Sequence, residues 1–91
     1  MSRFNFTKQN SVVTYNSGSM MYKDDPIFVT YETYYVVSRY GCSTREVSLY
    51  KDSKDDKWAG DIIEFGEWYD LDDEDVAEVI NFIKEIGKWN G

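Results

Sequence analysis

The stretch Ile27–Tyr40 most constrains the fold, because its residues are almost all β-branched or aromatic. Such side chains favour extended strands. Pro26 directly precedes it and disfavours a helix across this junction. Its fourteen residues exceed the usual length of a strand, so we expect a bend or a bulge midway. We expect its odd-numbered positions to form one apolar face and its even-numbered positions a mixed face partly in water. The chain must therefore build a β-sheet around this strand.

Shorter strand signals surround this stretch. Alternating or β-branched residues predict further strands at residues 3–7, 12–15, 20–22, 45–50 and 57–65. The turn-rich Asn16–Ser19 would let residues 20–22 pair back as a hairpin. We expect a second turn at residues 41–44 and a polar connection at residues 51–56. Gly60 in the last strand indicates a bulge or a close backbone contact. These hairpins predict an antiparallel sheet.

The last third of the chain predicts one amphipathic helix. When successive residues are placed 100° apart around a helix axis, one side carries a narrow apolar stripe of Val76, Val79, Ile80 and Ile83. Phe82, Ile86 and Trp89 flank this stripe. We expect the helix to begin at Asp72 or Asp73, with Asp70 or Asp72 as N-cap, and to end near Gly87. The sequence therefore predicts a single α+β domain over residues 1–91. In it, one C-terminal amphipathic helix packs on one face of an antiparallel sheet of four to six strands.

Negative charge is concentrated in the same last third of the chain. Residues 61–91 hold ten acids and two lysines, whereas residues 1–60 hold seven acids and eight bases. The net charge of −7 therefore resides in the C-terminal third. This distribution disfavours direct binding to nucleic-acid phosphates or to anionic membranes, which attract basic proteins. It favours a basic protein as the partner.

Eight of these acids are candidates for contacts with such a partner: Glu67, Asp70, Asp72, Asp73, Glu74, Asp75, Glu78 and Glu85. Favourable interaction with the helix dipole explains one or two acids at a helix start. Glu74 and Glu78 are like charges four residues apart, which destabilise a helix by roughly 0.2–0.5 kcal/mol. We expect Glu74, Glu78 and Glu85 to face outward, opposite the apolar stripe.

The spacing of acids along the helix is close to that of phosphates along DNA. Five acids between Asp72 and Glu78 extend over roughly 9 Å of helix, or about one charge per 1.8 Å. Duplex DNA carries about one charge per 1.7 Å. Two interpretations stay open: a solvated acidic face without a partner, and a surface that binds a basic protein. Mimicry of nucleic acid is one hypothesis within the second interpretation.

The residues that most enzymes use for chemistry are scarce. The chain has no histidine, which excludes Ser-His and Cys-His catalysis and most transition-metal sites. The single Cys42 has no histidine to activate it. The spacing of Asp70, Asp72 and Glu74 resembles the first half of a calcium loop, but Asn81 stands where such a loop needs glutamate. We therefore expect a protein without catalytic activity, cofactor or metal.

The cysteine count and the N-terminal residues indicate the cellular compartment in which the protein acts. One cysteine cannot form an internal disulfide, so nothing indicates an oxidising compartment. Residues 1–10 contain no apolar run of a secretory signal, and no stretch reaches the roughly 18 apolar residues that span a bilayer. We expect a cytoplasmic protein, acting in the host cytosol if a phage or plasmid encodes it.

In size, acidity and layout the chain is similar to small inhibitors made by phages and mobile elements, including DNA mimics and anti-CRISPR proteins. This similarity and the charge pattern favour an inhibitor that docks an acidic helix face into a basic, nucleic-acid-binding groove of another protein. Two alternatives stay open. One is an immunity protein against a nuclease toxin. The other is a single-stranded nucleic-acid-binding module whose sheet stacks bases on tyrosines, namely Tyr31, Tyr34, Tyr35 and Tyr40. A homodimer also stays open.

Overall fold

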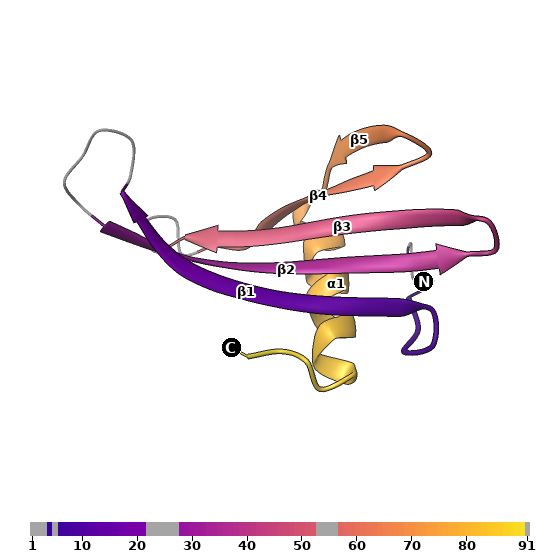
Figure 1. Cartoon of the computed structure of the whole chain (residues 1–91), viewed down its shortest axis with the longest axis horizontal. Coiled ribbons are helices and arrows are strands. Elements are labelled where there is room, and N and C mark those ends of the chain that lie inside the picture. The colour runs from indigo at the N-terminus through magenta and orange to yellow at the C-terminus, as the bar shows by residue number, and fades with distance from the viewer. Residues whose placement is uncertain (1–3, 5, 22–27, 53–56, 91) are drawn as a thin grey trace.

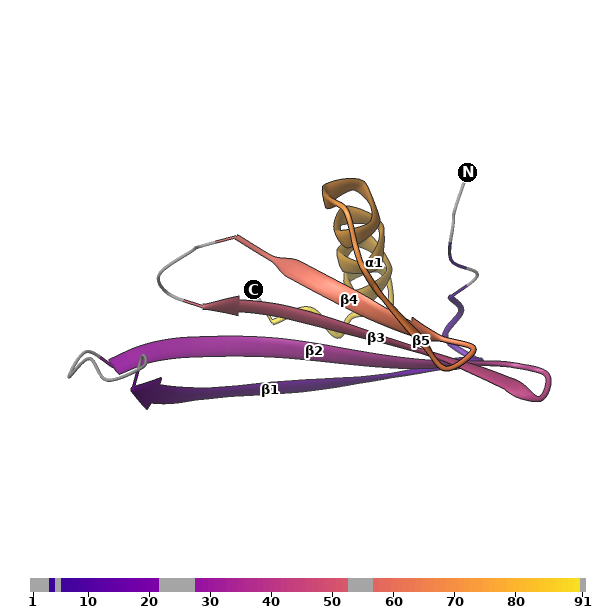
Figure 2. The same ribbon diagram turned by 90° about the horizontal axis from the view of Figure 1, so that it is seen from above.

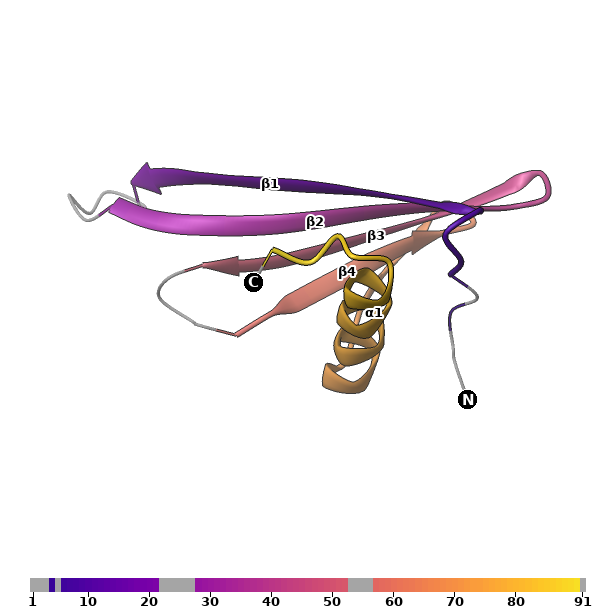
Figure 3. The same cartoon turned by 90° about the horizontal axis from the view of Figure 1, so that it is seen from below.

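The computed structural model of the protein describes residues 4, 6–21, 28–52 and 57–90. Five strands form one antiparallel sheet in which each strand pairs with its neighbours in sequence (Figure 1). The elements are β1 (Ser11–Met21), β2 (Phe28–Tyr40), β3 (Ser43–Asp52), β4 (Ala59–Glu64), β5 (Glu67–Asp70) and α1 (Asp73–Glu85). The helix and the N-terminal segment lie on the same side of the sheet (Figures 2 and 3). The predicted α+β architecture is confirmed.

β1 is one continuous strand where the sequence predicted a hairpin. Asn16–Ser19 forms no turn, and every residue of β1 pairs with a residue of β2. Gly18 leaves room for the Tyr31 ring on the neighbouring strand, since a Cβ atom there would come within 2.6 Å of the Tyr31 hydroxyl. The predicted hairpin between residues 12–15 and residues 20–22 is therefore wrong, with residue 22 lying outside the described residues. The long β2 offers hydrogen bonds along the whole segment, and this pairing outweighs the local preference for a turn.

β2 agrees with the predicted stretch over its described part, Phe28–Tyr40, but its predicted faces are reversed beneath the helix. Its register with β1 and β3 is unbroken, so β2 contains no bulge. Tyr34, Val36 and Ser38 are fully buried, whereas Tyr35 is 38 % exposed on the opposite face. Large side chains occupy both faces of this strand. The apolar pattern therefore could not identify the covered face, which depends on where the helix packs.

One predicted turn and one glycine position are close to the observed structure, and the predicted connection at residues 51–56 lies mostly outside the described residues. Gly41 and Cys42 form the two-residue connection between β2 and β3, with a positive φ of 61° at Gly41. β3 includes the first two residues of the predicted polar connection, and the remaining four lie outside the described residues. Gly60 makes the predicted close contact, because a Cβ atom there would lie 2.6 Å from the backbone oxygen of Ser48.

β5 is a strand that the sequence analysis missed. The predicted last strand ends at residue 65, but residues 67–70 pair with β4 across a two-residue turn. All four side chains are exposed. A strand without a buried face lacks the alternation of apolar and polar residues by which strands are identified. The β4–β5 hairpin forms the edge of the sheet opposite β1 (Figure 1).

The bounds of α1 agree with the prediction. Asp72 is the N-cap, and its side chain accepts a hydrogen bond of 2.8 Å from the backbone N–H of Asp75. Gly87, with a φ of 74°, ends the helix in a Schellman motif. The backbone N–H groups of Gly87 and Lys88 donate to carbonyls of the last turn at 3.1 and 3.0 Å. No helix among the described residues is long and apolar enough to cross a membrane.

The core lies between α1 and one face of the sheet, which we call the covered face. The predicted helix stripe is confirmed: Val76, Val79 and Ile83 are buried, and Ile80 packs at their margin. They meet buried side chains of the middle strands, which are Tyr34, Val36, Val47, Leu49 and Ile62. Trp89 extends this core beyond the helix, stacking on the Tyr34 ring with centroids 4.7 Å apart.

The N-terminal segment contributes to the core without forming the predicted strand. In the described part of residues 3–7 no strand is present. Phe4 is buried and stacks on Phe6 at a centroid distance of 5.1 Å. Phe6 in turn contacts the ring of Phe82 on α1 at 5.2 Å. The alternation that predicted a strand here reflects packing against the helix.

Candidate protein-binding surface

Four of the predicted contact residues lie exposed where β5 leads into α1, namely Asp70, Asp72, Asp73 and Glu74. Two of the four already have a role within the protein. Asp72 caps the helix. Asp73 forms an ion pair with Lys57 at 3.2 Å, and both side chains are exposed. An exposed pair of this kind contributes about 0–1 kcal/mol. Both Asp70 and Glu74 therefore remain accessible to a partner.

The other predicted residues of α1 differ from one another. Asp75 is buried, at 8 % exposure, so it offers little surface to a partner. Glu78 is half-buried and accepts a hydrogen bond of 3.0 Å from the backbone N–H of Phe4. It therefore holds the N-terminal segment against the helix, which differs from the outward position expected from the sequence. Glu85 is exposed and lines, with Glu78 and Phe6, a shallow pocket of about 410 Å³.

The β4–β5 hairpin brings acids directly opposite one another. Asp61 pairs with Asp70, and Glu64 pairs with Glu67. Like charges in directly opposed positions destabilise an antiparallel ladder. Arg45 offsets one of the two pairs, since its Nε lies 3.0 Å from Glu64 Oε2. At the other pair, Asp61 and Asp70, the opposed like charges act against strand pairing.

The position of Asp61 in the hairpin changes its pKa. Burial away from water raises the pKa of Asp61 above its usual 3.8. A hydrogen bond from the Trp68 side chain lowers the pKa in part, and the nearby charge of Asp70 raises it further. On the other side of the hairpin, the Tyr69 hydroxyl donates to Glu67, and this hydrogen bond raises the pKa of Tyr69 above 10.0.

The same hairpin exposes large apolar side chains, which the sequence analysis did not identify as functional. Phe65 is 79 % exposed and Trp68 is 58 % exposed, and Ile63 and Tyr69 are also exposed. These four belong to seven exposed large hydrophobic residues in the described part of the chain. The signal available in the sequence was the density of aromatic residues among acids in residues 63–70.

The tyrosines considered for base stacking do not form one platform. Tyr34 is buried beneath Trp89, and Tyr40 lies under the Arg45 guanidinium at 4.8 Å. Tyr31 packs over Gly18 on the opposite face, where Tyr35 donates its hydroxyl proton to a glutamate of β3. The four side chains are thus divided between the two faces of the sheet.

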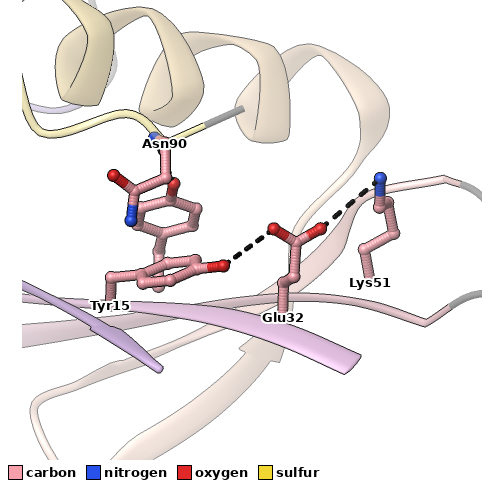
Figure 4. Close-up of polar contacts among 5 residues, drawn as sticks. Tyr15, Glu32, Lys51 and Asn90 are labelled. Carbon is pink, nitrogen blue, oxygen red and sulfur yellow. Dashed lines mark hydrogen bonds and ion pairs between the residues drawn. The ribbon is translucent and has the colours of Figure 1, made fainter. Parts of the chain in front are cut away.

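Polar contacts gather on the covered face beside the C-terminal segment (Figure 4). Tyr15 donates a hydrogen bond of 2.9 Å to Glu32, and Lys51 pairs with the same carboxylate at 3.7 Å. The backbone N–H of Asn90 donates to the Tyr34 hydroxyl at 2.7 Å. The bond to Glu32 raises the pKa of Tyr15 above 10.0. Glu32 thus joins three strands of the sheet and Tyr34 binds the C-terminal segment, so these contacts are best explained as structural.

Among the described residues, no three acidic or cysteine side chains are placed to share a metal ion. Cys42 lies exposed in the β2–β3 turn. Comparison of the chain with protein-family models, with curated proteins and with solved structures finds no match.

Proposed function

We propose that the protein is a non-catalytic binding protein that presents an acidic surface to a basic partner protein. The observation that carries this proposal is the arrangement of acids at one edge of the sheet. Two directly opposed acidic pairs in the β4–β5 hairpin lead into the exposed acids at the start of α1. Arg45 and Lys57 pair with one acid each, Glu64 and Asp73, and the sequence has no lysine or arginine between Lys57 and Lys84.

A surface of this kind attracts a basic partner over long distances. Electrostatic steering raises the rate of association and makes it strongly dependent on salt, because exposed charges are screened by ions. The most basic surfaces in a cytoplasm belong to proteins that bind nucleic acid. We therefore propose an inhibitor of a nucleic-acid-binding protein, of the kind that phages and mobile elements make. Immunity to a nuclease toxin would use the same surface, and the identity of the partner distinguishes the two.

Capture from a lysate of the encoding organism, followed by elution with increasing salt, tests the proposal. Asp70→Asn with Glu74→Gln removes two negative charges at the acidic edge. Thr14→Lys with Asn16→Lys changes the net charge by the same amount on the distant strand β1, where both residues are exposed. We expect the first double variant to release a captured basic protein at clearly lower salt, because local charge complementarity is reduced.

Two outcomes would contradict the proposal. Equal elution of both double variants would mean that only net charge matters and that no binding surface lies at the acidic edge. Tight binding of oligothymidine at low salt would instead favour a nucleic-acid-binding module.

A further inference from the structure

At the tip of the β4–β5 hairpin, one phenylalanine has a backbone conformation that is unfavourable for its bulky side chain, and that side chain is exposed to water. Phe65 and Gly66 form the two-residue turn, with positive φ values of 53° and 77°. Turns with positive φ at both positions favour Asn-Gly or Asp-Gly, because bulky side chains rarely adopt this conformation. Phe65 is also 79 % exposed. Neither turn geometry nor burial gives the fold a reason for phenylalanine here.

Other apolar side chains and two hollows surround Phe65. Ile63 pairs directly with Trp68 on the uncovered face, and Tyr69 lies on the other side of the hairpin. A hollow of about 340 Å³ lies between Phe65, Ile63 and the start of β3, where Thr44 lines it. A second hollow of about 240 Å³ lies between Phe65 and Tyr69. The hairpin is therefore an apolar ridge with space for partner side chains on both sides.

The charges around this ridge indicate the chemistry of its partner. Residues 58–83 include no lysine or arginine, and four acids border the ridge: Asp61, Glu64, Glu67 and Asp70. Arg45 on β3 pairs with Glu64, so acids outnumber bases around the ridge. A nucleic-acid backbone or a second copy of this edge would be repelled by these acids. Arginine suits the surface best, because a guanidinium group can stack on an aromatic face while it pairs with carboxylates.

We propose that the β4–β5 hairpin is the element that enters the partner protein. Phe65 fills an apolar pocket on a basic surface, and arginines around that pocket stack on Trp68 and pair with Asp61 and Asp70. Aromatic residues and arginine dominate the binding energy of many interfaces. This inference rests on the proposed function and places the centre of contact on the hairpin instead of the helix face.

A synthetic peptide in which arginines flank leucines serves as the probe, and the same peptide with glutamate for arginine is its control. We expect the arginine peptide to shift the amide resonances of residues 63–70 and the Trp68 indole resonance most strongly in a nitrogen-15 correlation spectrum. The glutamate peptide should leave them unchanged.

The Phe65→Asn variant distinguishes an effect on peptide binding from an effect on folding stability. Asparagine adopts positive φ more readily than phenylalanine, so this variant should keep or raise the melting temperature. We expect it to weaken binding of the arginine peptide about tenfold or more, since it removes an apolar anchor. Val12→Asn is the matched control, because Val12 is 67 % exposed on the sheet face that carries Ile63 and Trp68 but lies on β1. It should change the affinity less than about twofold.

Several outcomes would overturn the inference. Shifts centred on Glu74 and Glu85 with a silent hairpin would refute it while leaving the proposed function intact. Unchanged affinity in Phe65→Asn, or a fall in its melting temperature, would also refute it. A wild-type dimer that Phe65→Asn converts to a monomer would assign the ridge to self-association. If the arginine peptide fails to bind at low salt, both the inference and the proposed function are contradicted.

Discussion

The two faces of the sheet carry similar apolar residues, but only one of the faces is covered by a helix. On the covered face, Val36, Val47 and Leu49 are fully buried beneath α1. On the uncovered face, one row crosses all five strands in register and consists of Val12, Val37, Glu46, Ile63 and Trp68. Three of these five side chains are exposed by 40 % or more. The single helix can cover only one face, so apolar residues on the other remain available for a partner.

The difference between the two faces should have its largest effect on stability at two adjacent positions of β3. Leu49→Ala should lower the free energy of unfolding by about 2–5 kcal/mol, because it leaves a cavity under the helix. Tyr50→Ala, at the next residue and 44 % exposed on the other face, should lower it by about 1 kcal/mol or less. Denaturant unfolding of both variants measures the difference. Equal losses would mean that the uncovered face is also covered in solution.

Two glycines provide a second test of the same contrast. On the covered face, a methyl group at Gly60 would meet the backbone of Ser48, which cannot move aside. On the uncovered face, a methyl group at Gly18 would meet the end of the Tyr31 side chain. We expect Gly60→Ala to cost about 1–3 kcal/mol of stability and Gly18→Ala clearly less. Thermal unfolding measures both, and a larger loss at Gly18 would contradict the expected asymmetry.

The smallest expected effect concerns the acids of the uncovered face and depends on pH. Because the pKa of folded Asp61 is raised above 3.8, its ionised form is less favourable in the folded protein than in the unfolded chain. Asp61 therefore opposes folding at neutral pH, and this opposition disappears as pH falls through the raised pKa towards 3.8.

Asp61→Asn should therefore raise the free energy of unfolding slightly at neutral pH. The variant should also lack the stability that the wild type regains on acidification when Asp61 becomes protonated. Melting temperatures of the wild type and the variant, measured from neutral pH down through 3.8, provide the comparison. A wild type that is stabilised by the Asp61 charge at neutral pH would contradict the direction of the shift.

Local signals predicted the helix better than they predicted the strands. The stripe of Val76, Val79 and Ile83 follows from helical periodicity, and Asp72 and Gly87 mark the two ends by capping chemistry. β5 gave no such signal because none of its side chains is buried. The continuity of β1 through Asn16–Ser19 depends on the partner strand, which lies outside the local sequence.

The candidate surface was predicted in part. The sequence located the acids in the last third of the chain, because charge is a property of composition and position alone. It did not predict that Asp75 is buried or that Glu78 binds the backbone of Phe4, since both depend on segments far apart in the chain. It also did not predict the exposure of Phe65 and Trp68, because apolar residues are usually assigned to a core.

The sequence by itself therefore determined the class of fold, the helix with its two ends, and the concentration of negative charge. These follow from backbone preferences, periodicity and residue identity. Only the tertiary structure decided which face of β2 is buried, that β1 is continuous, and that acids oppose one another across the β4–β5 hairpin. The physical reason is that strand pairing and helix packing join segments distant in sequence, and their energies outweigh local preferences.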